Sequence, residues 1–166
     1  MSPACRNSYL GDLATGSLIN SPFVIMSFPI RSPRHLTGGI VVFARILDKI
    51  RLHSEGKLPE GYHVGIIPGN RTFDDRLCKF LGVDYDELRA RTLEGGTDEE
   101  ILAWCFSRGT QPNAEQIEVW NAFLSKRGWR DPATAGFEKA KAEAGLSGRD
   151  DVQTFFDVMD AEEGHV

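Results

Sequence analysis

The most apolar helix candidate in the chain lies near residues 39–54. Placed about 100° apart, its apolar side chains fall on one broad arc, and these are Ile40, Phe43, Ala44, Ile46, Leu47 and Ile50. Val41, Val42 and Leu52 fall on the opposite side, among the charged residues. Little of this helix therefore has the composition of a solvent-exposed face. The pattern predicts a central helix near residues 39–54 that the rest of the chain surrounds.

Shorter helical patterns follow this segment, and most of them begin at a polar residue that can cap a helix and end at a glycine. The predicted start signals are Thr72 with Asp75, Asp84 with Glu87, Thr97 with Glu100, Asn113, and Asp131-Pro132. A final helix carries Val152, Phe155, Phe156 and Met159 at helical spacing. These segments predict a mainly α fold, a compact single-domain bundle of about six to seven short helices.

Three segments lack a sustained helical period. Residues 1–22 are rich in small and polar side chains and predict a loosely ordered N-terminal arm, which leaves residues 23–163 as the single helical domain. Residues 23–30 are apolar but contain Pro29, which favours an extended segment over a helix. Residues 62–68 fit either a short strand or an extended loop, and the pattern does not separate the two.

Composition and charge narrow the choice of partners. The chain has 166 residues and a formal net charge of -5, which argues against general binding to nucleic acid. Its three cysteines, Cys5, Cys78 and Cys105, form no CxxC pair, and no secretory signal is recognisable, so a cytoplasmic location is expected. The apolar run at residues 23–26 is far too short to span a membrane, and no membrane partner is predicted.

Motifs of common enzyme and cofactor-binding classes are absent, including GxSxG, the P-loop and GxGxxG. The four histidines show no metal-binding spacing, and a site built from His63 with Asp74 or Asp75 is a less favoured alternative. No metal and no cofactor are therefore predicted. Residues 80–89 resemble a helix-turn-helix, but the second helix is acidic and would repel phosphate, so DNA binding is not expected either.

Charged residues on and before the central helix mark the candidate site. They form a cluster of Arg31, Arg34, Arg45, Lys49 and Arg51 that also contains Asp48. Guanidinium groups bind carboxylates and phosphates through two parallel hydrogen bonds. We therefore expect a small anionic substrate to be bound by Arg31, Arg34, Arg45 and Arg51, with Tyr62 and Asp74.

The same segment offers groups for proton transfer. Lys49, if removed from water beside other cations, would act as a base that Asp48 orients, and His63 would transfer protons if its loop folds over the helix. Asp48 also has a purely structural interpretation. Arg51 falls on the apolar arc, and an Asp48–Arg51 pair would neutralise its charge within the core. The sequence leaves the catalytic and structural interpretations of this pair open.

A series of short motifs runs along the chain: Arg31-Ser-Pro-Arg34, Gly38-Gly39, Leu47-Asp-Lys-Ile-Arg51, Tyr62-His63, Phe73-Asp-Asp-Arg76, Phe80-Leu-Gly82 and Leu102-Ala-Trp104. Their identity and order resemble a small bacterial family known only as a domain of unknown function. The resemblance covers about residues 29–125 and implies a compact, soluble bacterial domain, with no activity attached. The chain departs from the family pattern in a longer, glycine-containing connection at residues 65–70 and in its N-terminal arm.

Two functions from different classes fit these observations. The first is a small-molecule-binding domain whose pocket lies between the segments 31–51 and 62–75, with enzymatic activity left open. The second is a non-catalytic interaction module that presents Trp104 or Trp120 to a protein partner. The sequence does not determine the oligomeric state.

Overall fold

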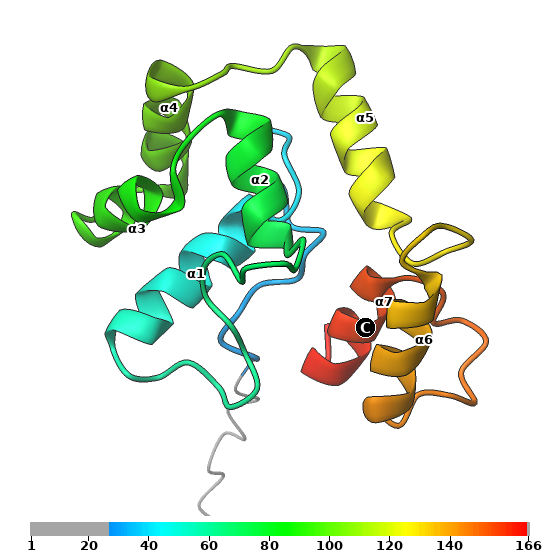
Figure 1. Ribbon diagram of the computed structural model, residues 1–166. Coiled ribbons are helices and arrows are strands. Elements are labelled where there is room, and N and C mark those ends of the chain that lie inside the picture. The colour runs from blue at the N-terminus through cyan, green and yellow to red at the C-terminus, as the bar shows by residue number, and fades with distance from the viewer. Residues whose placement is uncertain (1–26, 166) are drawn as a thin grey trace, which may run out of the picture.

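The computed structural model describes residues 27–165, which form α-helices joined by loops (Figure 1). The helices are α1 (Phe43–Ser54), α2 (Phe73–Leu81), α3 (Tyr85–Leu93), α4 (Asp98–Arg108), α5 (Ala114–Ser125), α6 (Thr134–Glu143) and α7 (Phe155–Glu163). Within this range the chain contains no strand, only an isolated bridge between Thr37 and Ile40. The prediction of a mainly α, single-domain fold is confirmed. The predicted arm at residues 1–22 and the apolar residues 23–26 lie outside the described part of the chain.

α1 begins at Phe43, later than the hydrophobic pattern predicted, because the chain before it makes a tight turn. The backbone N–H groups of Thr37 and Ile40 each donate to the other residue's carbonyl oxygen, at 3.1 and 2.9 Å. Gly38, Gly39 and Val42 have positive φ angles of 55°, 80° and 73°. Such angles do not continue a right-handed helix, so residues 39–42 lead into α1 and are not part of it.

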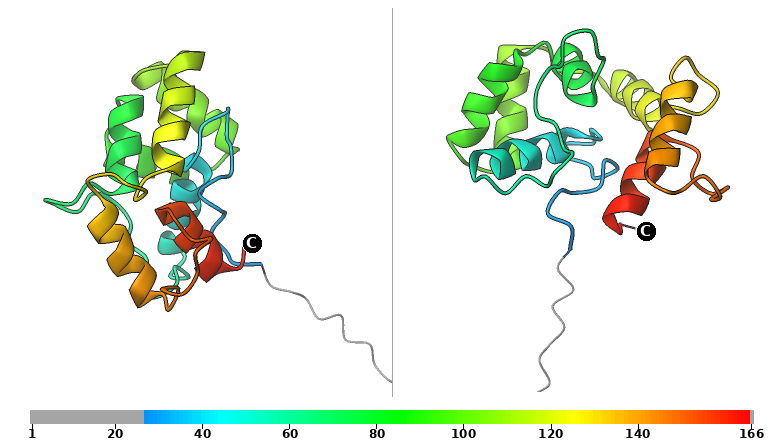
Figure 2. Two further views of the ribbon diagram at one scale, coloured as in Figure 1. Left: turned by 90° about the vertical axis from the view of Figure 1, so that its right-hand side faces the viewer. Right: turned by 60° about the horizontal axis from the view of Figure 1, so that its bottom comes forward.

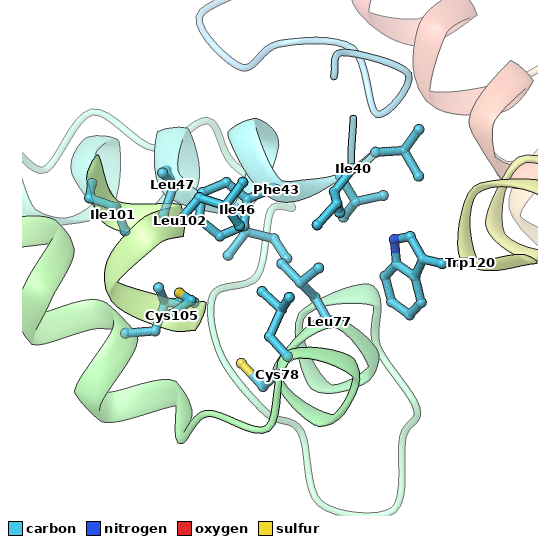
Figure 3. Packing of buried hydrophobic residues seen from close by; sticks show 14 of the residues in the cluster. Ile40, Phe43, Ile46, Leu47, Leu77, Cys78, Ile101, Leu102, Cys105 and Trp120 are labelled. Atoms are coloured by element: carbon cyan, nitrogen blue, oxygen red, sulfur yellow. The ribbon is translucent and has the colours of Figure 1, made fainter. Parts of the chain in front are cut away.

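The predicted central position of α1 is confirmed by its burial. Every side chain from Phe43 to Leu47 is buried, including that of Arg45. Figure 3 shows the cluster around this helix, in which α1 residues gather with Leu77 and Cys78 of α2, Ile101, Leu102 and Cys105 of α4, and Trp120 of α5. Because these residues come from four helices, α1 is the element on which the others pack.

Helix starts lie where the capping signals predicted them. The side chains at the N-caps of α2 to α5 accept hydrogen bonds from backbone N–H groups two or three residues further on, and these caps are Thr72, Asp84, Thr97 and Asn113. Each such cap stabilises a helix by about 1 kcal/mol. α6 begins at Thr134, two residues after the proline that was expected to open it.

The helices form two groups connected by α5 (Figure 1, Figure 2). α1 to α4 enclose the main core, which Trp120 and Leu124 of α5 and Phe156 of α7 complete. α6 and α7 also pack on each other around a smaller core of Phe137, Val152 and Val158. Between α1 and α2 runs an irregular connection, in which residues 62–68 form a loop and no strand. This loop and the two helix groups create the space in which the candidate site lies.

Candidate functional site

A cleft of about 730 Å³ lies between the two helix groups. One wall comprises α1 and the start of α2, and the opposite wall comprises α6 and α7, on the two sides of the molecule seen in Figure 1. Pockets for small molecules commonly have volumes of about 300–1,000 Å³. Of the nine candidate residues from the sequence, five line this cleft, namely Arg45, Lys49, Tyr62, His63 and Asp74.

Lys49 and Asp74 form an ion pair that joins α1 to the start of α2. The Lys49 ammonium group donates to Oδ1 of Asp74 at 2.6 Å and to the backbone oxygen of His63 at 3.0 Å. The other carboxylate oxygen of Asp74 accepts from the backbone N–H of Gly65 at 3.2 Å. The expectation that Asp48 orients Lys49 was therefore wrong. Asp74 holds the ammonium group instead, and the pair also positions the loop that carries His63.

Arg45 and Tyr62 both bind Glu163, a buried carboxylate that the sequence patterns did not single out. Arg45 donates to its two oxygens at 2.7 and 2.5 Å, and the Tyr62 hydroxyl donates to Oε1 at 2.6 Å. Burial and the Glu163 carboxylate both raise the pKa of Tyr62, so this hydroxyl remains protonated at neutral pH. Burial alone would lower the pKa of Arg45, but Glu163 raises it overall. Arg45 is thus already paired within the protein.

Asp48 belongs to a second ion network, which ties the segment before α1 to the start of α4. Arg31 donates to the Asp48 carboxylate through Nε and Nη2, at 2.8 and 2.7 Å, and through its backbone N–H at 3.0 Å. The hydrogen bond with Asp48 is the main reason why the pKa of Arg31 is raised. Arg51 lies 3.9 Å from Asp48 but only 2.8 Å from Asp98. The predicted Asp48–Arg51 contact exists, but each residue has a closer partner.

Arg34 lies beside α7 and does not line the cleft. Its guanidinium group pairs with Asp157 and with Asp160, the latter at 3.0 Å, and it lies over the ring of Phe156. All four arginines that were expected to bind a substrate therefore have carboxylate partners within the protein. Most of the positive charge of these four arginines is therefore neutralised within the protein.

Three further arginines line the cleft, and the sequence patterns did not single them out. Arg71 directly precedes the N-cap of α2, Arg76 ends the first turn of that helix, and Arg127 follows α5. Positive charge near a helix N-terminus opposes the helix dipole. The unfavourable placement of two arginines around one helix start is the signal that could have identified Arg71 and Arg76, whereas no sequence pattern marks Arg127.

Other reactive or amphipathic side chains are engaged in packing. Cys78 and Cys105 are buried free thiols, and burial raises the pKa of both to about 12. Trp120 is only 8% exposed and stacks on Phe80, with ring centroids 4.4 Å apart. Within residues 27–165 no three His, Cys, Asp or Glu side chains converge so as to hold a metal ion. No helix in that range is long and apolar enough to cross a bilayer.

Comparison with known proteins assigns a family but no activity. No curated protein is significantly similar to the chain. A family model described as "Domain of unknown function (DUF5069)" matches residues 27–165. The motifs between Arg31 and Trp104 had indicated a family of this kind over a shorter segment, and the match extends to the end of the α6–α7 group. The chain belongs to the DUF5069 family.

Proposed function

We propose that this protein binds a small anionic molecule in the cleft between its two helix groups. The observation that supports the proposal most directly is the surplus of cationic side chains at one end of the cleft, where Arg71, Arg76 and Arg127 converge. Two carboxylates, Asp74 and Glu162, also line the cleft, and Asp74 is already neutralised by a lysine. A local excess of positive charge in a concave site attracts anions even when the net charge of the chain is -5.

Binding has more support than turnover. Lys49 donates to two acceptors, and an ammonium group held in this way has no lone pair with which to act as a base. His63 has an exposed side chain beside the cleft, so we retain it as the proposed proton-transfer group. We do not extend the catalytic proposal to Asp48, whose carboxylate Arg31 holds outside the cleft.

The interaction-module alternative has less support. The indole of Trp120 is buried against Phe80 and Trp104 is half-buried in the main core, so neither is presented as that function requires. Val119 and Phe123 on α5 are exposed and line a groove with Phe80 and Trp120, but this groove is smaller than the apolar patches that mark protein partners.

We also propose a cytoplasmic location, in keeping with a metabolite ligand. Cys78 and Cys105 are unpaired thiols within the core. Unpaired core thiols fit a reducing compartment, where disulfides rarely persist.

A thermal-shift screen tests the proposed function. The protein is heated with phosphate, sulfate, citrate, acetate and several phosphate monoesters, each at the ionic strength of a sodium chloride reference. A ligand that binds the native state at 100 times its Kd stabilises the protein by about 2.7 kcal/mol, and Tm rises accordingly. We expect at least one anion to raise Tm, with saturable binding in calorimetry. The proposal fails if every anion gives the Tm of the chloride reference.

A further inference from the structure

We propose that Arg71, Arg76 and Arg127 form a phosphate-binding site at the α2 end of the cleft, and that the natural ligand is a phosphate monoester. This inference rests on the proposed function, since it names the chemical group that the anion presents and the residues that hold it. The three side chains come from the loop before α2, from α2 itself and from the connection after α5. They meet only because these segments border the same cleft.

The charge balance of this cluster is incomplete. Arg127 pairs with Asp131 at 2.6 Å, and the nearby Asp75 is already bound by a lysine at 2.8 Å. Within the described residues, neither Arg71 nor Arg76 lies within 4.0 Å of a carboxylate oxygen. Three guanidinium groups therefore share one partner carboxylate, and positive charge remains unneutralised at the wall of the cleft.

The arginines are close enough to repel one another. The guanidinium carbons of Arg76 and Arg127 each lie 5.4 Å from the centroid of the same Phe123 ring. Burial lowers the pKa of Arg76, and the charges of Arg127 and Arg71 lower it further. Holding several positive charges close together in a partly buried site opposes folding. Such an arrangement is expected where a ligand supplies the missing negative charge.

The number of charges favours phosphate over carboxylate. A phosphate monoester carries about -1.5 to -2 charges at neutral pH and three acceptor oxygens, enough to neutralise Arg71 and Arg76 together and also bind Arg127. A monocarboxylate has a single charge and saturates one guanidinium fork. At the start of α2 the Thr72 side chain already accepts from the Asp75 N–H, so the arginine side chains and not the helix N–H groups would bind the phosphate.

The remainder of the cleft suits a small organic group of mixed polarity. Phe73, Phe155 and Met159 provide apolar contacts, while Tyr62 and Glu162 provide polar ones. A volume of about 730 Å³ accommodates a ligand of drug-like size. A nucleic-acid strand would place many phosphates against a chain of net charge -5, whereas the three arginines suffice for one anionic group. The ligand is therefore a small phosphate ester.

Isothermal titration calorimetry on the full chain tests this site. The probes are inorganic phosphate, a pentose 5-phosphate, a hexose 6-phosphate and a nucleoside 5′-monophosphate, each ester compared with its dephosphorylated form and with citrate at equal ionic strength. At least one ester should bind, and its dephosphorylated form should not. Arg76→Gln and the double variant Arg71→Gln/Arg76→Gln should raise the Kd of that ester by about 10- to 100-fold.

A matched control removes the same charge elsewhere. Arg89 is an exposed residue of α3 that does not line the cleft, and Arg89→Gln should change the Kd less than about twofold because distant surface charges are screened. The unliganded Arg76→Gln protein should keep or exceed the wild-type Tm, since the substitution removes a repelled charge. If that variant does not fold, the exposed Arg71 allows the same measurement with Arg71→Gln alone.

The outcomes separate this inference from the proposed function. If a phosphate ester binds the wild type and the double variant with equal Kd, the three-arginine site is wrong, while the proposed binding of a small anion stands. If citrate binds as tightly as every ester and loses affinity equally in the variants, the assignment to phosphate is wrong. If no anion binds the wild type, both the proposed function and this inference fail.

Discussion

Arg45 of α1 and Glu163, the last residue of α7, form a buried ion pair across 118 positions of sequence. Two hydrogen bonds of 2.7 and 2.5 Å join them, and their side chains are 6% and 0% exposed. The Tyr62 hydroxyl donates to the same carboxylate. Because neither charge can be hydrated, each depends on the other, and the pair links the two helix groups on either side of the cleft.

Breaking this pair should be the most destabilising charge substitution in the protein. Glu163→Gln leaves Arg45 as a buried cation without its counter-charge, and we expect a loss of about 3–5 kcal/mol in the free energy of unfolding. Urea unfolding followed by circular dichroism measures the change. Glu162→Gln is the control, because that neighbouring side chain is exposed. Equal stability of the two variants would contradict the importance of the pair.

The ion network around Asp48 predicts unequal effects for the two residues that the sequence paired. Asp48→Asn removes the negative charge and one of the two oxygens that accept the short Arg31 bonds, and it should cost about 1–3 kcal/mol. Arg51→Ala should cost less than about 1 kcal/mol, because Arg51 is partly exposed and its closer partner, Asp98, keeps an ion pair with Arg31 at 2.7 Å. Urea midpoints of the two variants, with a double variant to test coupling, decide the order. A larger effect of Arg51→Ala would restore the original interpretation.

Gly109, between α4 and α5, should not tolerate a side chain. A Cβ atom there would lie 2.1 Å from the backbone oxygen of Leu81, which accepts a hydrogen bond from the N–H of Thr110 at 2.7 Å. Gly109→Ala must displace backbone atoms and should lower stability by about 1–3 kcal/mol. Gly148→Ala, with no heavy atom within 4 Å of the added Cβ, should stay within about 0.5 kcal/mol. Thermal unfolding of both variants provides the comparison.

Stability should decline in alkaline solution. Burial raises the pKa of the Cys78 and Cys105 thiols from 9.0 to about 12, so above pH 9 the unfolded chain loses these protons while the native state keeps them. The free energy of unfolding therefore falls as pH rises, by at most about 1.4 kcal/mol per pH unit for each thiol. Urea midpoints between pH 7 and 10.5 measure the slope. A Cys78→Ala/Cys105→Ala variant should show a shallower decline, and an equal slope would assign the effect to other groups.

Much of the fold was predictable because its signals are local. Thr72, Asp84, Thr97 and Asn113 satisfy backbone N–H groups within their own first helical turn, so the helix starts are visible in short stretches of sequence. The apolar arc of the central helix likewise predicted its burial. The exception was the start of α1, where the positive φ of Val42, a β-branched residue, gave no sign in the hydrophobic pattern.

The charged residues were harder to interpret, because the spacing of charges along the sequence does not identify which residues they contact. Sequence spacing favoured a pair of Asp48 with Arg51. In the structure Arg31, from the segment before α1, lies closer to Asp48 than Arg51 does. The cleft is lined by the candidates Lys49, Tyr62, His63 and Asp74, which the sequence had assigned to a single pocket. Their actual partners, and the role of Glu163, depend on helices that are distant in sequence.

The sequence by itself determined the helices, the central position of α1 and the family, because capping, apolar periodicity and short motifs are properties of contiguous residues. Only the tertiary structure decided which charges are neutralised and which are not. It paired Arg31, Arg34, Arg45 and Arg51 with carboxylates from other segments, and it placed Arg71, Arg76 and Arg127 together at the cleft. Coulomb interactions depend on distance in space, and that distance is set by packing between segments far apart in the chain.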